Sequence, residues 1–423
     1  MRENFLHYIW KYKKFEMLHL KTTQHETITL VSVGSHNHDS GPDFFNAQLI
    51  IDEQLWAGNV EIHIKSSDWY AHHHEQDKAY DNVILHVVYE HDTDVFRKDN
   101  STIPTLELKH YIYKGVLQKY QKLFSNTSKW INCETDFAQT EEFILNHWLE
   151  RLYFERLERK SKTIEDLLKV SKNNWEAVLF KLLTKNFGLK VNGESFFSFA
   201  KSIEFSIIRK TQSNLFSIEA LLFGQAGLLE KDIEDTYYQD LKKEYRFLEQ
   251  KFQLSNKFVV PLQFFRLRPS NFPTLRLSQL ANLYHKEQSF FSKILASETL
   301  EEFYKLFEVS ASQYWKTHYT FQKTSKTSEK ILTKSFIDLL LINTIIPIKF
   351  SYAKQKGETI NEQLLDIIRG IDSEKNSIIE KYNSLKKVSN SALESQALVQ
   401  LKIEYCNKHQ CLQCAIGNSL LNK

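Results

Sequence analysis

Polar and apolar residues alternate along residues 59–65, NVEIHIK, and this alternation constrains the fold more than any other feature of the chain. Successive side chains of a β-strand point to opposite faces of the sheet. A strand here would carry Val60, Ile62 and Ile64 on one face and Glu61, His63 and Lys65 on the other. We therefore expect an apolar face packed on a core and an acid beside an imidazole on a rigid support, where a metal ion is held well.

Acidic residues and histidines are concentrated in the first 120 residues. This part carries 12 Lys and Arg against 17 Asp and Glu, a net charge of −5, whereas the remaining residues carry 43 against 35, a net charge of +8. Twelve of the 16 histidines lie between His7 and His110, and imidazole is both a common metal ligand and a frequent base. We expect the chemistry in the N-terminal part. The basic remainder either attracts a polyanion such as nucleic acid or is only a solvated surface.

The predicted secondary structure changes at about residues 115–140. Before this point, helices are predicted at 3–15 and near 69–80, and strands are predicted at 28–33, 44–51, 56–64 and 83–90. After it, apolar residues follow helical spacing, and only 11 Gly and 6 Pro occur in the whole chain, so helices can be long. We predict an α/β domain over 1–115, a linker over 116–140 and a larger all-helical region over 141–423 with a cysteine-rich end.

The composition favours a cytoplasmic protein without a membrane anchor. The first ten residues contain Glu3 and no long apolar core, unlike a signal peptide. The longest apolar run, 336–350, contains Asp338, Pro347 and Lys349 and is shorter than the roughly 20 residues that span a bilayer. No membrane partner is therefore expected.

Several motifs together resemble an uncharacterised bacterial family that is described only as a domain of unknown function. These motifs are GPDFFNAQ, GNVEIHIKSSDW, HHHEQD and YDNVILHVVYEHD in the first part, and LFGQAGLL, RLRPSNFPTLRL and YWKTHY later in the chain. The resemblance extends over the full length. It implies no activity.

The order of elements supports a second resemblance, which does imply chemistry. Helix, three strands, helix and strand, with Pro42-Asp43 and then Glu61-x-His63, are similar to the αβββαβ restriction-endonuclease-like core of the PD-(D/E)xK nuclease superfamily. The resemblance implies that Asp43 and Glu61 bind Mg²⁺ or Mn²⁺, which neutralises charge on a phosphodiester and activates water.

Position 63 departs from that pattern, because the superfamily has lysine where this chain has His63. His63 would then be a ligand, act as a base or mark an inactive descendant, and Lys65 on the same face is an alternative to the missing lysine. His38, before the Gly-Pro turn, is a further candidate ligand at the hydrolytic site. The predicted catalytic residues are Asp43, Glu61, His63 and Lys65.

Three arginines lie in or beside a proline-rich segment, RLRPSNFPTLRL. Arg266, Arg268 and Arg276 surround Pro269 and Pro273, which stiffen the backbone. Guanidinium groups on stiff backbone suit bidentate recognition of phosphate, so these arginines are candidate phosphate-binding residues. Salt bridges to the acidic N-terminal domain are the alternative.

The four cysteines form the remaining candidate site. Cys406, Cys411 and Cys414 have the spacing C-x4-C-x2-C, and Cys133 is the fourth cysteine of the chain. Four thiolates complete a tetrahedral metal site, and a reducing compartment favours metal over disulfides. We expect Zn²⁺ or an iron–sulfur cluster, with His409 as a competing fourth ligand. Buried thiols without metal are the alternative.

The leading hypothesis from these patterns is a divalent-metal-dependent nuclease or phosphodiesterase acting on nucleic acid. The rival is a catalytically inactive protein that retains the nuclease-like fold and binds nucleic acid or protein.

Overall fold

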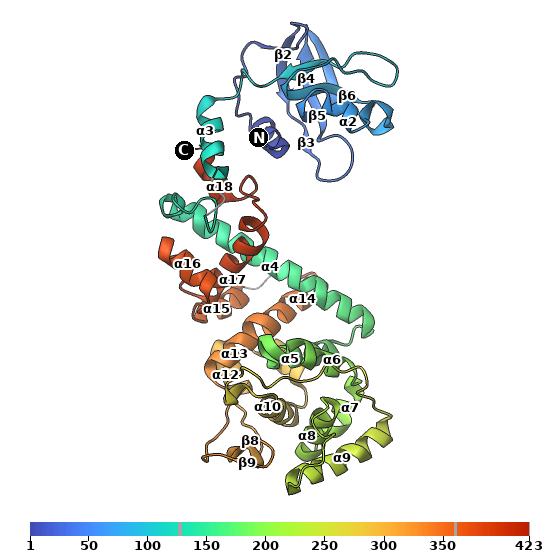
Figure 1. Ribbon diagram of the computed structural model, residues 1–423, viewed down its shortest axis with the longest axis vertical. Coiled ribbons are helices and arrows are strands. Elements are labelled where there is room, and N and C mark those ends of the chain that lie inside the picture. The colour runs from blue at the N-terminus through green and yellow to red at the C-terminus, as the bar shows by residue number, and fades with distance from the viewer. Residues whose placement is uncertain (126–128, 359–361, 423) are drawn as a thin grey trace. The chain divides into compact units, whose positions relative to one another are not determined.

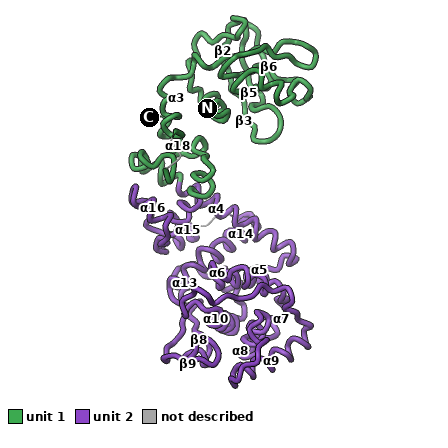
Figure 2. The backbone as a smooth tube through the Cα atoms, in the orientation of Figure 1, with its two compact units in different colours: residues 1–148, 401–423 green, residues 149–400 purple. Residues whose placement is uncertain are grey.

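The chain forms two compact units (Figure 2). A computed structural model describes residues 1–125, 129–358 and 362–422. The first unit contains residues 1–148 together with 401–423, and the second contains residues 149–400. The N-terminal part holds a mixed sheet and the remainder is mostly helical, as predicted (Figure 1). The cysteine-rich end, which sequence patterns grouped with the helical region, belongs to the first unit.

The sheet of the first unit has the order β1-β2-β4-β5-β6-β7, with β3 paired to β4 (Figure 1). Strands β2, β4 and β5 are antiparallel neighbours, whereas β5, β6 and β7 run parallel. The bounds are β1 Leu20–Lys21, β2 Thr27–Ser32, β3 Ser35–His36, β4 Phe44–Ile51, β5 Gln54–Lys65, β6 Val83–Glu90 and β7 Thr105–Glu107. The predicted strands 44–51 and 83–90 match β4 and β6.

The helices around the sheet are shorter than predicted. Helix α1 (Glu3–Lys11) ends four residues before the predicted limit. The helix predicted near 69–80 is wrong, because α2 (Asp68–Ala71) stops and two 3₁₀ turns follow at His74–Gln76 and Lys78–Tyr80. His73 adopts a left-handed conformation with φ of 60°, which an α-helix does not accept.

The centre of β5 is buried on both faces. Val60 and Ile62 are fully buried on the predicted apolar face, while Glu61 and His63 are only 5% and 1% exposed on the other. Gly58 allows β6 to approach, since a Cβ at this position would lie 2.4 Å from a side-chain carbon of Ile84. The polar face of β5 is therefore an enclosed surface rather than a solvated one.

The rest of the first unit comes from segments distant in sequence. It contains α3 (Lys114–Phe124), a 3₁₀ turn at Phe137–Gln139, the start of α4 (Glu142–Val170), a π-helix at Leu401–Cys406 and α18 (Ala415–Asn422). Lys402 Nζ donates to the carbonyl of Trp130 over 2.8 Å, a contact between residues 272 apart in sequence. Tyr8 Oη donates to Asn422 Oδ1 over 3.4 Å.

The described residues of the second unit, 149–358 and 362–400, are mostly helical and include a small hairpin. Strands β8 (His318–Thr320) and β9 (Lys323–Thr324) form the hairpin, and a π-helix occupies Leu341–Ile345. The helices that follow α4 are α5 Trp175–Phe187, α6 Leu189–Lys201, α7 Phe205–Thr211, α8 Leu215–Gln225, α9 Thr236–Phe252, α10 Pro273–Lys286, α11 Phe290–Ala296, α12 Leu300–Leu306, α13 Lys334–Leu340, α14 Ile346–Lys356, α15 Glu362–Gly370, α16 Ser377–Leu385 and α17 Ala392–Gln400.

One helical stretch of the second unit, Lys334–Lys356, is long and apolar enough to cross a membrane by length and composition. Two-thirds of its most apolar part, 67%, is buried inside the protein. This burial is the pattern of a core helix in a soluble protein.

Candidate metal centre

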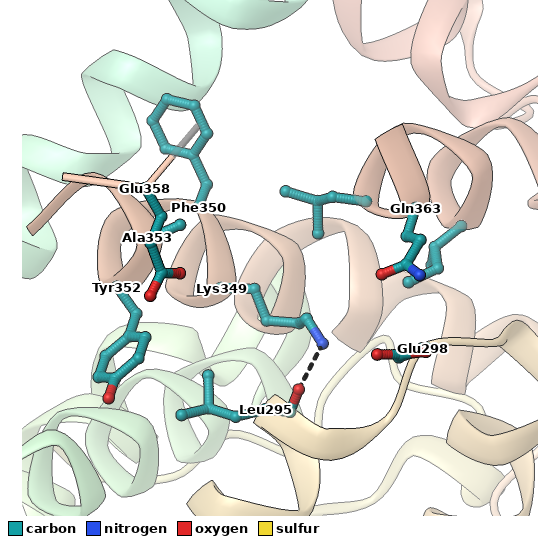
Figure 3. A pocket seen from close by; sticks show the side chains of 10 residues that line it. Leu295, Glu298, Lys349, Phe350, Tyr352, Ala353, Glu358 and Gln363 are labelled. Carbon is teal, nitrogen blue, oxygen red and sulfur yellow. Dashed lines mark hydrogen bonds between the residues drawn. The ribbon is translucent and has the colours of Figure 1, made fainter. Parts of the chain in front are cut away.

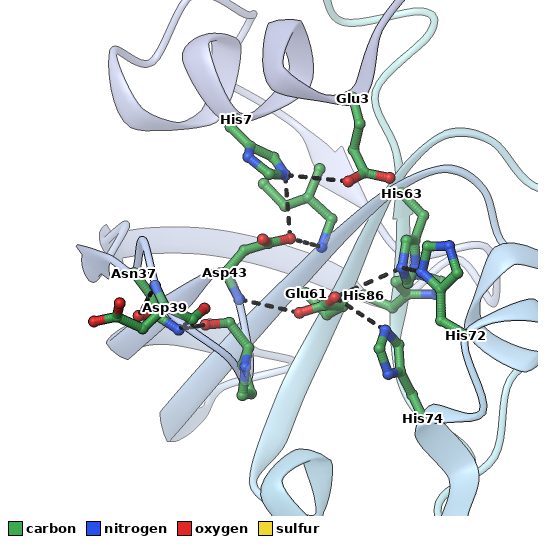
Figure 4. Close-up of polar contacts among 12 residues, drawn as sticks. Glu3, His7, Asn37, Asp39, Asp43, Glu61, His63, His72, His74 and His86 are labelled. Carbon is green, nitrogen blue, oxygen red and sulfur yellow. Dashed lines mark hydrogen bonds and ion pairs between the residues drawn. The ribbon is translucent and has the colours of Figure 1, made fainter. Parts of the chain in front are cut away.

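Asp43 and Glu61 face each other across the β4–β5 pair (Figure 4). The Asp43 N–H donates to Glu61 Oε2 over 3.0 Å, and the Ile62 N–H donates to Asp43 Oδ2 over 3.0 Å. The turn at Gly41-Pro42 positions Asp43, with Gly41 at φ of 100°. The structure thus brings together the two acids that the sequence analysis proposed as ligands.

Glu61 is held in surroundings that oppose its negative charge. Burial, followed by the charge of Asp43, raises the pKa of Glu61 to about 9. Ionisation of buried Glu61 beside the Asp43 carboxylate is costly unless a cation lies near it. The pair therefore favours a bound cation or a bound proton.

Three histidines lie near Glu61, and two of them, His63 and His74, approach its carboxylate directly (Figure 4). Glu61 Oε1 lies 3.6 Å from His63 Nε2 and 3.3 Å from His74 Nε2, and His63 Nε2 lies 3.1 Å from His72 Nδ1. Tetrahedral ligands about 2.0 Å from a metal lie roughly 3.3 Å from one another. The ligand atoms of His63, His72 and His74 lie within 4.8 Å of one another, which is close enough for these three residues to hold one metal ion. We call them, together with the adjacent Glu61, the histidine cluster.

The local backbone structure directs each of the three imidazoles toward the histidine cluster. His63 comes from β5 and is buried, whereas His72 follows α2 and is exposed. The left-handed residue His73 turns the chain so that the His74 ring stacks on Tyr80, with centroids 3.8 Å apart. His74 Nε2 is buried, and its 3.3 Å approach to Glu61 Oε1 does not have the geometry of a hydrogen bond. The cluster is thus closed at His63 and open to solvent at His72.

His86 lies behind His63. The two rings approach through His63 Nδ1 and His86 Nε2 at 2.9 Å. Burial lowers the pKa of His63 to about 2 and that of His86 to about 3. Neutral imidazole is the form that binds metal. If a metal bound at Nε2, His63 would donate a hydrogen bond from Nδ1 to His86. Such a bond fixes the orientation of the His63 ring although His86 does not touch the metal.

A second group of imidazoles lies around Asp43. His7 Nε2, from α1, is 3.2 Å from Asp43 Oδ2 and 3.9 Å from Glu3 Oε1. Burial lowers the pKa of His7, but the hydrogen bond and charge of Asp43 outweigh it, and the net shift is upward. His38, a predicted ligand, lies against His36 with ring centroids 4.3 Å apart. The structure groups His38 with His36 rather than with the histidine cluster.

The remaining predicted residue on β5, Lys65, lies apart from the two acids. Its side chain is exposed at the end of the strand, and its charge acts on Asp92. Asp92 itself accepts hydrogen bonds from the Ser66 Oγ–H and the Ser67 N–H. The Lys65 ammonium is therefore solvated at the surface of the protein.

The predicted phosphate-binding arginines differ in exposure. Arg266 and Arg268 are exposed in the segment before α10. Arg276 lies inside α10, is 6% exposed and stacks on the Phe336 ring at 3.6 Å. Its guanidinium donates to Gln279 Oε1 over 2.9 Å and to Asn271 Oδ1 over 2.7 Å. Arg276 is therefore a packing residue, and Arg266 and Arg268 are the two that remain accessible to a phosphate.

The four cysteines line one small cavity in the first unit. His409, the competing fourth ligand, is exposed instead, with Nδ1 3.3 Å from Asn132 Oδ1. The structure thus groups Cys133, rather than His409, with the three cysteines near the C-terminus.

A larger cavity of about 300 Å³ lies in the second unit (Figure 3). Lys349 is the cation in its wall, and its Nζ donates to the carbonyls of Ile294, Leu295 and Ser297 at the end of α11. The ammonium is thus committed to capping a helix.

The sequence places His72 and His74 after the Glu61 strand, where they could complete the site, but a solvated turn is the alternative for the HHH run, and the predicted ligands do not include them. In the structure His72 and His73 are exposed, as in such a turn, whereas His74 is half-buried. The signal that was available is the proximity of three consecutive histidines to the end of the Glu61 strand.

Comparison with known proteins places the chain in a family whose function is unknown. A family model described as "Protein of unknown function (DUF2851)" matches residues 3–377. The chain belongs to this family, as its motifs predicted. No curated protein and no solved structure matches the chain.

Proposed function

We propose that this protein is a divalent-metal-dependent phosphodiesterase that acts on nucleic acid. The convergence of Asp43, Glu61 and three imidazoles at the centre of β5 carries the proposal. The order α1, β2, β4, β5, α2, β6, with an antiparallel run followed by a parallel strand, supports a restriction-endonuclease-like core. The two metal-binding acids of such a core would correspond to Asp43 and Glu61.

The ligand set favours a transition metal. Imidazole nitrogens suit Zn²⁺ and similar ions, whereas Mg²⁺ prefers oxygen ligands. The histidine cluster therefore fits Zn²⁺ better than Mg²⁺, whereas Mn²⁺ would depend mainly on the carboxylate oxygens of Glu61 and Asp43. A bound ion would supply a Lewis acid and a water of lowered pKa.

The residues around the ion would have distinct tasks. His63 is buried and its Nδ1 lies 2.9 Å from His86 Nε2, so we assign His63 the role of a ligand through Nε2 rather than that of the base. Burial lowers the pKa of His7, but the hydrogen bond and charge of Asp43 raise it overall, and His7 is the residue we propose to donate a proton to the leaving oxygen. Exposed His72 borders the route by which substrate and water reach the cluster.

Nucleic acid is proposed as the substrate because the remainder of the chain is basic. Residues after 120 carry a net charge of +8, and a basic surface attracts phosphates without regard to sequence. Exposed Arg266 and Arg268 are the side chains proposed to contact phosphate. A cytoplasmic location is part of the proposal.

The rival function is an inactive binding protein with the same fold. The substitution of the superfamily lysine by His63 and the burial of Glu61 and His63 favour it. Such a protein would bind nucleic acid without cleaving it.

A cleavage assay separates the two. Purified protein with Mn²⁺ or Zn²⁺ is incubated with single-stranded, double-stranded and branched DNA and RNA, alongside Asp43→Asn and Glu61→Gln. We expect cleavage that both variants lose and that the control Glu219→Gln keeps. Binding without cleavage by metal-loaded protein would establish the rival instead.

A further inference from the structure

Cys133, Cys406, Cys411 and Cys414 approach one another from two distant parts of the chain. Cys133 precedes α4, whereas the other three lie between the end of the π-helix Leu401–Cys406 and the start of α18. All four line one cavity. Their side chains are thiols rather than disulfides.

The cavity has room for a single ion. Its volume is about 10 Å³, which is about the space of one water-sized sphere. A cluster of four iron and four sulfur atoms would need far more room. The volume therefore favours one ion over an iron–sulfur cluster.

The thiols are largely shielded from solvent. Cys133 and Cys414 are buried, at 8% and 6% exposure, and Cys406 and Cys411 are half-buried. Ligand atoms enclosed in this way are typical of a closed structural metal centre.

Gly417 fits α18 against the cysteine loop. A Cβ at this position would lie 2.1 Å from the carbonyl oxygen of Cys411. A glycine here therefore lets the first turn of the helix reach both Cys411 and Cys414, which brings the loop and the helix to one point.

We propose that the four cysteines bind one Zn²⁺ as a structural tetrathiolate site. The site would join the segment around Cys133 to residues 401–422, two segments already in contact through Lys402 and Trp130. Zn²⁺ with four cysteine ligands is a closed structural centre with no position left for substrate. This inference is independent of the function proposed for the histidine cluster.

Zinc analysis of the full chain tests the site. The variant His72→Ala removes a ligand from the histidine cluster, so that zinc retained after dialysis reports on the cysteines. We expect one zinc per chain in His72→Ala, none when Cys411→Ser is added, and one when the matched control His409→Ala is added. Retention by the Cys411→Ser chain, or equal loss in the His409→Ala chain, would overturn the assignment.

A spectroscopic measurement covers the case in which Cys411→Ser fails to fold. X-ray absorption of zinc in folded His72→Ala should show four sulfur neighbours at about 2.3 Å. Cobalt substitution of the same protein should give strong sulfur-to-cobalt absorption. Nitrogen or oxygen neighbours, or iron with inorganic sulfide in the purified protein, would contradict a zinc tetrathiolate.

Discussion

Glu61 in the first unit and Glu219 in the second are both buried carboxylates, at 5% and 1% exposure. Burial raises the pKa of both. Glu219 Oε1 accepts hydrogen bonds from Trp315 Nε1 over 2.8 Å and from the Ser312 hydroxyl over 3.1 Å. Glu61 accepts a backbone N–H from Asp43 and otherwise faces a second acid and two imidazoles.

The comparison separates a structural acid from one prepared for a ligand. Buried polar groups in folded proteins are normally satisfied by hydrogen bonds within the protein. Glu219 meets this rule through neutral donors. Glu61 has no comparable set of neutral donors, and a bound cation or a bound proton would make its surroundings favourable, which is why we propose the chemistry there.

The largest expected effect is on metal affinity. Glu61→Gln removes the one anionic ligand of the histidine cluster and should weaken Zn²⁺ or Mn²⁺ binding at least about 100-fold, more than the loss of a second-layer partner. Isothermal titration of the metal-free protein measures it. Glu219→Gln, which keeps an acceptor oxygen for Trp315, should bind metal as the wild type does; equal losses in both variants would erase the distinction between the two acids.

A smaller effect on metal affinity is expected for His86→Leu. The substitution removes the partner of His63 Nδ1 without touching the metal, and second-layer losses cost about 10- to 100-fold in affinity. The matched control is His285→Leu in the second unit, where Nδ1 lies 2.7 Å from the Gln212 carbonyl. Competition with a chromophoric chelator compares the two. Unchanged affinity in His86→Leu would show that His63 is oriented without His86.

The free energy of unfolding of the wild type, relative to Lys160→Met in the second unit, is expected to depend on pH. Lys160 Nζ donates to the Ile342 carbonyl and Asn343 Oδ1, and burial lowers its pKa to about 7. The unfolded chain then binds more protons between pH 7 and about 10.5, so stability rises with pH there. Relative to Lys160→Met, the wild-type free energy of unfolding should rise by less than about 1.4 kcal/mol per pH unit.

Urea titrations at several pH values measure that difference. Subtracting the Lys160→Met values removes the contributions of groups that both chains share, including Glu61. A difference that stays constant with pH, or falls as pH rises, would mean that Lys160 remains charged in the folded protein.

The smallest effect is expected for Lys65→Ala. Because its side chain is exposed beside Asp92, solvent screens its charge from the acids. Metal affinity and cleavage should change by less than about twofold. A loss of cleavage as large as that in Glu61→Gln would restore Lys65 as the substitute for the missing lysine.

Features that depend on neighbouring residues were predictable from the sequence. Alternation along 59–65 gave β5 and the position of Glu61 beside His63, and the Gly-Pro turn placed Asp43 at the start of β4. The helical remainder followed from the spacing of apolar residues. Apolar residues of 364–385 also follow helical spacing, which predicts a helical segment there, and the structure divides it between α15 and α16.

Features that depend on a single backbone angle or on distant segments were not predictable. His74 reaches Glu61 because His73 is left-handed and Tyr80 supports the ring, and neither is visible in residue patterns. The burial of Arg276 against Phe336 joins residues that sequence spacing cannot relate. That Cys133 rather than His409 joins the other cysteines required knowing how residues 130–136 meet the π-helix.

The composition of the first unit from residues 1–148 and 401–423 has a consequence for synthesis. Domains generally fold as they leave the ribosome, with the N-terminal one first. Here the second unit emerges whole before the residues that hold Cys406, Cys411 and Cys414, so the first unit is finished last although it is begun first. Until those residues are made, Cys133 has no other cysteine to join. A chain truncated within α17 would contain the residues of the sheet but could not form the cysteine cavity.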